Sequence, residues 1–470
     1  MGRGWPGFYH LLFVKFTNLT RANEIGANSY LLEFDGDGRI ILDAGLHPRK
    51  DGEEAMPNLG AVGERPADAL IVSHAHHDHV GSLPLFVRRQ EKMPVYLSEA
   101  TYLLAEPLLH NSVEVMLKQR ASLGITSYPL FTHKEVDRAA KSYRICRAGY
   151  ECSIDGESAP KGGPLSFRLY PGGHLLGAVG VRFRHRDRQI LYTGDVSFQE
   201  QTLMPPADFP LDGIDTLIIE ATRGGKETPE NQRRPMEIER LISSIQATFR
   251  RGGSVLIPVF ALGKTQELLA TLYLEQKAGR LSRCPITIGG LSRSFTQIYD
   301  RLASRSFRRH PGLSLLGDVA PTVLDGRTVR HLSPKPGEIY LVSSGMMTER
   351  TLSNILAQRF LPEERHSILV VGYCDPNSPA GQLLQTSRGN LVALDSESPP
   401  RPLLCEVDQF DLTSHAIRED LLAYIFRLNP RLCVLVHGDP PALAWFQERL
   451  REERPGIEVV VPPPGESLDL

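Results

Sequence analysis

Short apolar runs separated by glycine, proline and polar turns recur along the first part of the chain. They occur at 11–16, 29–34 and 39–42, and an Asp-Gly-Asp-Gly turn joins the last two. β-prone runs bounded by such turns predict paired strands. Two later runs, at 69–72 and 189–192, are apolar throughout and lead directly into polar residues. They predict short buried strands that end on functional side chains.

The middle of the chain alternates between two patterns. Apolar residues repeat with a helical period over 235–251 and over 264–276, which predicts two helices. Strands that alternate with helices in this way indicate βαβ units and a parallel sheet. The strands expected here are the apolar runs at 216–219, 255–257, 339–342 and 368–371.

Shorter segments of the same kind follow toward the C-terminus. Helical periodicity predicts helices over 417–428 and 442–451. Two proline-rich stretches, at 205–210 and 398–402, interrupt the pattern and mark places where a domain could begin or end. The strands expected in this part are the runs at 403–407, 432–436 and 457–461.

Composition narrows the class of protein. The 470 residues are 41% hydrophobic and 23% charged, as in soluble globular proteins, which excludes a largely disordered chain. No apolar run reaches the roughly 18 residues that a membrane span needs, so we expect no membrane association. The net charge of −2 gives no overall attraction to nucleic acid, which would have to bind in a local basic groove. The six cysteines are sparse, and Cys146 and Cys152 lack zinc-knuckle spacing, so we expect reduced thiols in a cytoplasmic protein.

The most informative segment lies directly after the strand expected at 69–72. Histidines and an aspartate crowd into the sequence His-Ala-His-His-Asp-His. Imidazole nitrogens and carboxylate oxygens are ligands that suit zinc. In an extended loop His74 and His76 point the same way and can share one metal. Asp78 and His79 come from the following turn and can face a second metal beside it.

One loop cannot fill two coordination spheres, so further ligands must come from distant parts of the chain. His174 lies in a glycine-rich segment, Asp195 follows the strand expected at 189–192, and His437 follows the strand expected at 432–436. A lone histidine at a strand end is more often a structural residue than a ligand. Taken together, these three residues complete two metal sites, so the weak signals support one another.

These candidates occur in the order of a known superfamily. The chain resembles the metallo-β-lactamase superfamily of hydrolases and, within it, the β-CASP family of nucleic-acid-processing nucleases. Three further residues match motifs of that family: Glu220 after a strand, His415 before a helix and His437 at a strand end. The residues that match the superfamily motifs are Asp43, His74, His76, Asp78, His79, His174 and Asp195.

The resemblance implies an α/β fold and a domain organisation. A four-layer αββα metallo-β-lactamase fold would be built from residues 1–209 and 400–470. A parallel α/β β-CASP domain, residues 210–399, would be inserted between them and would cover the metal site. The two proline-rich stretches fit the entry and exit points of this insertion.

The resemblance also implies roles for the site residues. Two zinc ions per chain are expected, with Asp195 bridging them and Asp43 orienting the histidine loop. A simpler role for Asp43, capping backbone N–H groups, is compatible with orienting the histidine loop. His415, oriented by Glu220, would be the general acid, and Asp78 would serve both as ligand and in catalysis. The alternative to an orienting role for Glu220 is that it is an ordinary carboxylate of a β–α loop. The expected ligands are His74, His76 and His174 for one zinc, and Asp78, His79 and His437 for the other.

The function implied is a zinc-dependent ribonuclease that hydrolyses single-stranded RNA by a two-metal hydroxide mechanism. RNA is favoured because the DNA-directed branch of the family tends to carry valine in place of His437. Endonuclease and 5′-exonuclease modes use the same residues, so both remain open. The alternatives are a DNA-directed nuclease, a small-molecule hydrolase and a non-catalytic RNA-binding partner subunit. Relatives often form homodimers, but no apolar stretch of this sequence identifies an interface.

Several positions depart from the family pattern. The motif Glu-Ser-Thr-Tyr-Gly reads Glu-Ala-Thr-Arg-Gly, with Ala221 and Arg223 at the changed positions. Glu349 and Arg350 stand where a Gly-Gly pair is usual, and the loop 374–379 lacks its usual Gly-Thr. Because these positions lie in or beside the insertion, they bear on the substrate path and not on the metal chemistry. Basic residues that are candidates for contacting RNA include Lys264, Arg293 and Arg350.

Overall fold

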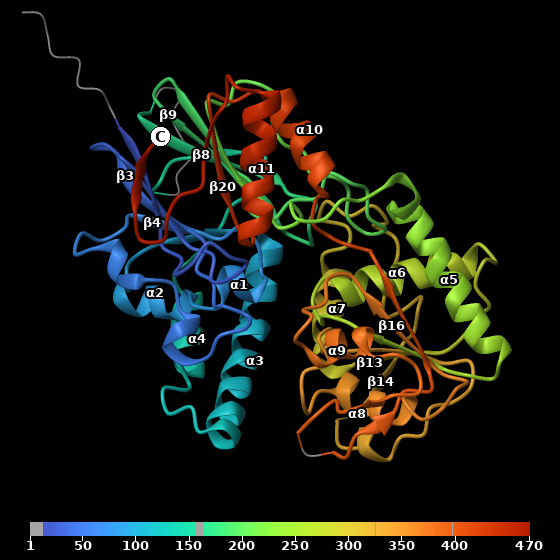
Figure 1. The fold of residues 1–470 in the computed structure, drawn as a ribbon. Coiled ribbons are helices and arrows are strands. Elements are labelled where there is room, and N and C mark those ends of the chain that lie inside the picture. Colours follow the sequence, from blue (N-terminus) through green and yellow to red (C-terminus); the bar gives the residue numbers. More distant parts are fainter. Residues whose placement is uncertain (1–12, 156–162, 325, 397) are drawn as a thin grey trace, which may run out of the picture.

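The computed structural model has two lobes and describes residues 13–155, 163–324, 326–396 and 398–470. One lobe contains the first and last parts of the chain, and the other contains the middle (Figure 1). Three large sheets and a two-stranded ribbon make up the β-structure of the described residues. The first two sheets belong to the first lobe, and the third belongs to the second lobe.

The first sheet joins both ends of the chain. β1 to β3 form the antiparallel meander expected from the sequence, and β4 to β6 continue it in parallel. β22, at the C-terminus, pairs antiparallel with β1. In spatial order the strands are β22 (Ser467–Asp469), β1 (Val14–Asn18), β2 (Tyr30–Phe34), β3 (Gly38–Leu42), β4 (Ala69–Ile71), β5 (Val95–Leu97) and β6 (Tyr143–Ile145).

The second sheet combines a long antiparallel hairpin with parallel strands. β8 and β9 pair over seven residues each, and β11 pairs in parallel with both β10 and β20. In spatial order the strands are β21 (Glu458–Val460), β20 (Leu432–Val436), β11 (Thr216–Glu220), β10 (Arg188–Tyr192), β9 (Val179–His185), β8 (Leu165–Pro171) and β7 (Glu151–Cys152).

Helices cover the outer faces of these two sheets, which gives four layers (Figure 1). Large aromatic side chains, including Phe34, Phe167 and Phe183, fill the space between the sheets and are fully buried there. The four-layer αββα arrangement expected from the resemblance is therefore confirmed. The helices are α1 (His77–Val80), α2 (Leu83–Arg89), α3 (Glu99–Leu123) and α4 (His133–Ala140) on one side, and α10 (Arg418–Leu428) and α11 (Pro440–Glu453) on the other.

The third sheet is parallel throughout, as the alternating pattern predicts. Its order is β14 (Thr322–Leu324), β13 (Ile286–Gly289), β15 (Ile339–Val342), β12 (Val255–Pro258), β16 (Ser367–Val371) and β19 (Glu406–Phe410). Its helices are α5 (Arg234–Arg250), α6 (Lys264–Lys277), α7 (Gly290–Arg301), α8 (Leu352–Phe360) and α9 (Pro379–Gln385), and the ribbon is β17 (Leu391–Val392) with β18 (Arg401–Pro402).

Strand pairing bears on where the insertion begins and ends. β11 lies within the range 210–399 expected for the insertion, yet it pairs with strands of the second sheet. β19 lies within the range 400–470 expected for the outer domain, yet it pairs with β16 of the third sheet. We therefore propose that the insertion starts after β11 and ends after β19.

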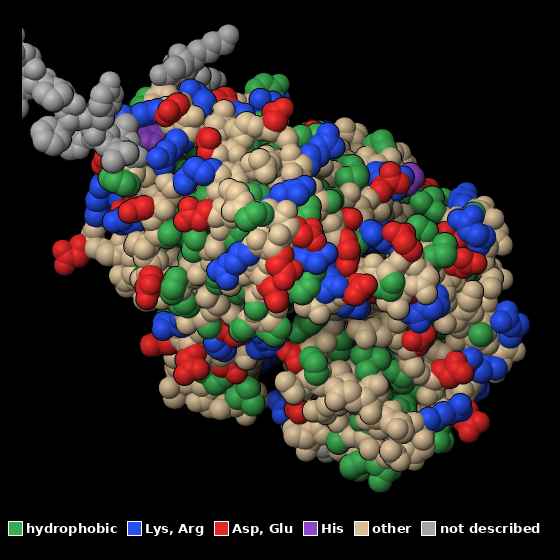
Figure 2. Space-filling model, turned by 45° about the horizontal axis from the view of Figure 1, so that its top comes forward, with side chains coloured by type: hydrophobic (Ala, Val, Ile, Leu, Met, Phe, Trp, Pro, Cys, Tyr) green, Lys and Arg blue, Asp and Glu red, His purple; other side chains and the backbone are tan. Residues whose placement is uncertain are grey.

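The surface shows no dominant charge on the face drawn in Figure 2, where Lys and Arg side chains are interspersed with Asp and Glu. This matches the nearly balanced sequence charge of −2. Among the helices of the described residues, none is long and apolar enough to cross a bilayer.

Candidate metal centre

The predicted site residues lie at or just after the carboxyl ends of strands, and loops bring them together. Asp43 and His437 follow β3 and β20 and take left-handed backbone conformations, with φ of 58° and 50°. Such conformations are uncommon outside glycine and cluster at functional sites. The others are His74, His76, Asp78 and His79 after β4, His174 after β8, Asp195 after β10, Glu220 at the end of β11 and His415 after β19.

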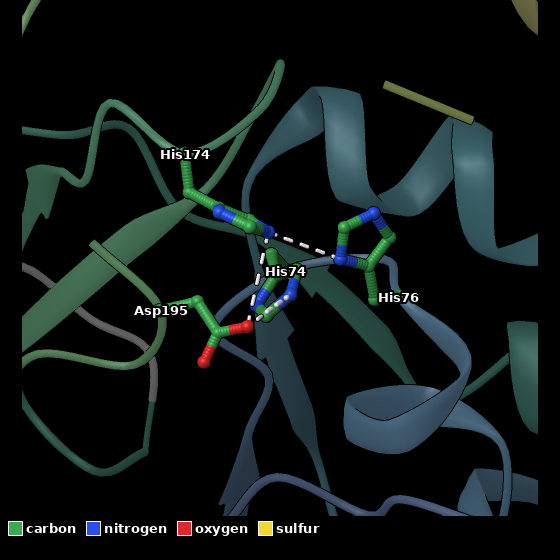
Figure 3. A group of neighbouring side chains, drawn as sticks. All are labelled: His74, His76, His174 and Asp195. Carbon is green, nitrogen blue, oxygen red and sulfur yellow. Dashed lines mark hydrogen bonds and ion pairs between the residues drawn. The ribbon is translucent and has the colours of Figure 1, made fainter. Parts of the chain in front are cut away.

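Four side chains form a first group (Figure 3). His174 Nε2 lies 3.0 Å from His76 Nδ1. Asp195 Oδ2 lies 3.5 Å from His74 Nε2 and 3.8 Å from His174 Nε2. The ligand atoms of the whole group fall within 4.8 Å of one another, so one ion could contact all of them. These are the three histidines predicted for one zinc, together with the predicted bridge.

A second group lies on the other side of Asp195. Asp78 Oδ2 is 3.8 Å from His79 Nε2 and 3.4 Å from His437 Nε2. The second oxygen of Asp195, Oδ1, is 3.3 Å from His79 Nε2 and 2.7 Å from His437 Nδ1. Asp195 thus directs one carboxylate oxygen to each group, which is the geometry that a bridging ligand needs.

The polar atoms in these groups are not satisfied by the protein alone. His74 Nε2, Asp195 Oδ1 and His437 Nε2 are buried and form no hydrogen bond of acceptable geometry, although other atoms lie close to them. Buried polar atoms without partners cost free energy and call for an explanation, such as an ion. The donor set of imidazoles and carboxylates is one that suits zinc. The residues present therefore fit a metal centre.

Without a cation the two groups hold their protons differently. Burial lowers the pKa of His74 and His174 well below the usual range, and it lowers that of His76 to about 4, so the histidines of the first group are neutral. In the second group burial acts the same way, but Asp195 and Asp78 outweigh it and raise the pKa of His437 to about 10. His79 is shifted upward for the same reason, with its pKa well above the usual range. Protons there supply the positive charge that a metal ion would bring.

The carboxylate of Asp43 anchors the loop that follows β4. This carboxylate accepts hydrogen bonds from the backbone N–H of Ser73 (2.6 Å) and from the hydroxyls of Ser73 (2.8 Å) and Tyr192 (2.6 Å). The fourth contact, 2.8 Å, is to His79 Nδ1, which leaves Nε2 of that ring facing the second group. Asp43 therefore both caps backbone N–H groups and orients a ligand, so the two roles considered for it are combined.

His415 lies beside the two groups and is held by Glu220. Its Nδ1 is 3.0 Å from Glu220 Oε2 and 3.2 Å from Oε1, and its Nε2 is 3.9 Å from Asp195 Oδ2. Glu220 is almost completely buried, and its Oε1 also accepts a hydrogen bond from the backbone N–H of Val196 at 2.7 Å. Burial opposes protonation of His415, but Glu220 and Asp195 outweigh it and raise its pKa. The arrangement favours an imidazolium with its Nε2–H directed at the site.

The inserted domain closes over this centre. A side chain at Gly263, between β12 and α6, would place its Cβ 3.7 Å from His76 Nε2. Lys264, which the sequence offered as a candidate for contacting RNA, is buried instead, with its ammonium group on the backbone carbonyl of Leu412. Its sequence position at the start of a helix could not reveal this. Arg293 and Arg350 are exposed.

Two supporting contacts were not anticipated from the sequence. The backbone carbonyl of Ser414 lies 2.9 Å from His174 Nδ1, so the segment that carries His415 also fixes a ligand. Arg223 contacts Asp411 twice, with Nη1 to Oδ1 at 2.8 Å and Nη2 to Oδ2 at 2.6 Å. The contact of Ser414 could not be predicted from the sequence, because every residue has a backbone carbonyl. The departure from tyrosine at position 223 was visible, but its partner four residues before His415 was not.

Three family models match consecutive parts of the chain. Residues 22–228 match the metallo-beta-lactamase superfamily, residues 265–383 match the Beta-Casp domain, and residues 401–462 match a Zn-dependent metallo-hydrolase RNA specificity domain. Together with the four-layer fold and the ligand groups, these matches define the class: the chain is built from a metallo-β-lactamase domain, a Beta-Casp domain and an RNA specificity domain. Proteins of the metallo-β-lactamase superfamily depend on metal ions, and the Beta-Casp match lies between the other two, as the sequence motifs indicated.

Curated relatives resemble the chain over most of its length. It is 26% identical over 449 residues to an endoribonuclease, YSH1, of Saccharomyces cerevisiae, and 27% identical over 442 residues to the cleavage and polyadenylation specificity factor 73 of Drosophila melanogaster. Each alignment covers 93% of this chain but only 56% and 61% of the relatives. The chain thus spans a little over half of their length.

A solved structure supports the fold. The crystal structure of a protein of unknown function from Enterococcus faecalis V583 matches with a TM-score of 0.58 at 15% identity, covering 97% of this chain and 100% of that one. At this identity the match concerns the fold alone.

Proposed function

We propose that this protein is a zinc-dependent endoribonuclease that hydrolyses phosphodiester bonds of single-stranded RNA and holds two zinc ions per chain. The observation that carries the proposal is His415, held by Glu220 at one nitrogen and directed at Asp195 with the other, beside two ligand groups. A small-molecule hydrolase would not need this additional acid. The match to an RNA specificity domain and the names of the curated relatives support RNA as the substrate.

In this proposal each ligand group has a defined role. His74, His76 and His174 would hold one zinc, Asp78, His79 and His437 the other, and Asp195 would contact both. When bound, paired zinc ions lower the pKa of water and stabilise negative charge on a phosphate. Asp43 would keep Nε2 of His79 available as a ligand by accepting a hydrogen bond from Nδ1–H of that ring.

His415 supplies the proton for the departing group. Cleavage of the P–O bond leaves negative charge on the 3′-oxygen of the upstream nucleotide, and a positioned acid can protonate that oxygen as the bond breaks. Nε2–H of His415 is free for this because Nδ1 is engaged by Glu220. The carboxylate of Glu220 stabilises the protonated ring and sets its orientation.

A cleavage assay tests the proposal directly. Wild type, His415→Ala and the control His310→Ala would be incubated with zinc and 5′-labelled single-stranded RNA or its DNA counterpart, and metal would be counted by mass spectrometry. We expect about two zinc ions in all three proteins, internal cuts in RNA by wild type and the control, and a loss of at least about 100-fold in His415→Ala. Zinc-loaded wild type that leaves RNA intact would overturn the proposal, and preferential cutting of DNA would redirect it to the DNA-directed alternative.

Dimerisation and cytoplasmic localisation stay predictions from the sequence, because neither the fold nor the relatives' names bear on them.

A further inference from the structure

Two exposed aromatic rings lie at the edge of the third sheet that faces the metal centre. All strands of this sheet are parallel, so the loops that follow them emerge at the same edge, where ligands of such sheets bind. The loop after β12 approaches His76 through Gly263, and the loop after β19 carries His415. Side chains on these loops are therefore neighbours of the site where a substrate would react.

Phe260 lies on the first of these loops, three residues before Gly263. Its side chain is 43% exposed, although every residue of β12 before it is buried. It packs against the backbone of Gly345, where an added Cβ would lie 3.1 Å from Phe260 Cε2. Any larger residue at position 345 would displace the ring. The glycine supports one part of the ring and leaves the rest open.

Tyr373 follows β16 at the same edge and is 52% exposed. Burial of its hydroxyl end raises the pKa of Tyr373, and the nearby Asp375 and Asp439 carboxylates add to the rise while Arg49 opposes it. Asp439 comes two residues after His437, and Arg49 Nη2 lies 3.8 Å from Asp439 Oδ1. Phe260 is thus three residues from the glycine that approaches the first ligand group, and Tyr373 lies near a carboxylate two residues from a member of the second group.

Neither ring pairs with another aromatic ring among the described residues. Among the aromatic contacts of the described residues, none includes Phe260 or Tyr373, whereas large buried rings such as Phe167 and Phe183 pair with one another. Every nucleic-acid base has a flat face that stacks on an open aromatic ring, and such stacking tolerates any sequence. A polymer laid across the site would bring its bases to both rings.

We propose that Phe260 and Tyr373 are stacking platforms for two bases of single-stranded RNA, one on each side of the metal centre. The inference rests on the proposed ribonuclease function and specifies how that site holds its substrate. It gives the inserted domain a part in RNA binding that does not depend on the metal-binding residues. It also fits the nearly balanced net charge of −2, since stacking needs no positive charge.

The test measures binding separately from cleavage. In a zinc-loaded His415→Ala background, the Kd for a labelled single-stranded RNA would be measured by fluorescence anisotropy. The added changes would be Phe260→Leu, Phe260→Trp, Tyr373→Leu and Tyr373→Phe, with Tyr150→Leu as control because Tyr150 is an exposed aromatic of the β6–β7 loop. We expect each change to leucine to weaken binding about 10-fold. The aromatic replacements and the control should keep the parent Kd.

Abasic nucleotides locate the contact. An RNA series with one base removed at successive positions would be measured against the same proteins. At the position that stacks on Phe260, removal of the base should weaken binding about 10-fold in the parent and have no further effect in Phe260→Leu. Tyr373→Leu should show the same loss of sensitivity at a different position.

Several results would overturn the inference. These are an unchanged Kd in both leucine variants, abasic effects that are the same in parent and variant at every position, or no measurable binding of RNA by the parent. A partner-protein segment that covers the rings would give the first of these results. The outcomes are distinct from failure of the proposed function, which shows as intact RNA after incubation with zinc-loaded wild type.

Discussion

At the scale of single residues, the site depends on how buried charges are paired. Identical imidazoles behave differently here: burial keeps the histidines of the first group neutral, while the carboxylates of Asp195 and Asp78 keep protons on the second group. From residue types, spacing and the family resemblance, the sequence predicted the residues that the structure brings together in the two groups. It could not show that Asp195 directs one oxygen to each group, because that depends on the backbone after β10.

Glu220 offers the sharpest single-residue test of the acid. In Glu220→Gln the amide oxygen can still accept the hydrogen bond from Val196, but the negative charge that stabilises a protonated His415 is lost. We expect kcat to fall about 100-fold with KM and zinc content unchanged. Steady-state kinetics on single-stranded RNA and metal analysis would show this. A kcat equal to that of wild type would mean that Glu220 is the ordinary loop carboxylate considered at first.

Lys264 makes a prediction about stability and pH. Burial lowers the pKa of Lys264 from its ordinary value of 10.5 to about 7, with Arg234 adding to the effect. Between those values the unfolded chain keeps a proton that the folded protein has released. The free energy of unfolding should therefore rise with pH in that window, by at most about 1.4 kcal/mol per pH unit from this group.

The variant Lys264→Met removes this titration. The difference in unfolding free energy between Lys264→Met and wild type should favour the variant most near pH 7 and shrink as the pH rises toward about 10. Urea unfolding of both proteins with saturating zinc, repeated across that range, measures the difference, and other titrating groups cancel. A difference that does not change with pH would mean that the lysine stays protonated in the folded protein, through its contact with Leu412.

At the scale of elements, the sequence predicted strands most accurately where the apolar runs were continuous. Buried strands such as β4, β12 and β15 are unbroken apolar runs, and they were expected within a residue or two. The hairpin of β8 and β9 was not expected, although Val179–His185 alternates buried and partly exposed positions. Sheet membership was harder, because nothing in the short sequences of β11, Thr-Leu-Ile-Ile-Glu, and β19, Glu-Val-Asp-Gln-Phe, indicates which strands they pair with. Only long-range pairing separates them.

The ion pair between Arg223 and Asp411 joins the ends of those two strands. Arg223 lies on the turn after Glu220, and Asp411 lies on the loop that leads to His415, so the pair fixes how Glu220 and His415 meet. Its side chains are each 10% exposed, and a bidentate contact of this kind has a defined geometry. Arg223 stands where the family motif has tyrosine, so this ion pair is a feature of the present chain and not of the motif.

Breaking the pair should therefore misplace the acid without affecting the metal. We expect Arg223→Lys and Asp411→Asn to lower kcat about 10-fold with KM and zinc content near those of wild type, since small misplacements of a reacting group are costly. Asp408→Asn is the matched control: Asp408 lies on the same strand, and its ion pair with Arg240 at 2.7 Å is exposed. If the control lost as much activity as Asp411→Asn, the effect would belong to the strand and not to the pair.

At the scale of the whole molecule, the chain crosses between its two lobes twice, and both crossings meet at the site. Glu220 ends the last strand before the insertion, and His415 follows the last strand of the insertion. The motifs predicted which residues would meet. They could not predict that the carbonyl of Ser414 would fix His174, because such a contact depends on how the lobes pack. The candidate metal centre thus lies at a joint between the lobes.

A joint of this kind should make global stability depend on metal. Without cations, buried atoms of His74, Asp195 and His437 lack partners, and a ligand bound at 100 times its Kd stabilises a fold by about 2.7 kcal/mol. At roughly 2–4 °C per kcal/mol for domains of this size, removal of zinc with a chelator should lower Tm by about 5–10 °C, and returning zinc should restore it.

Two variants separate the ligand groups. Asp195 faces both groups, so Asp195→Asn should lose most of the bound zinc and show almost no change of Tm with chelator. His76 belongs to the first group alone, so His76→Asn should keep about one ion per chain and part of the Tm shift. Thermal unfolding and metal counts on the same samples test both. If chelation removes zinc from wild type and Tm stays the same, the ligand groups are held rigid by the protein alone, and the metal is not part of what joins the lobes.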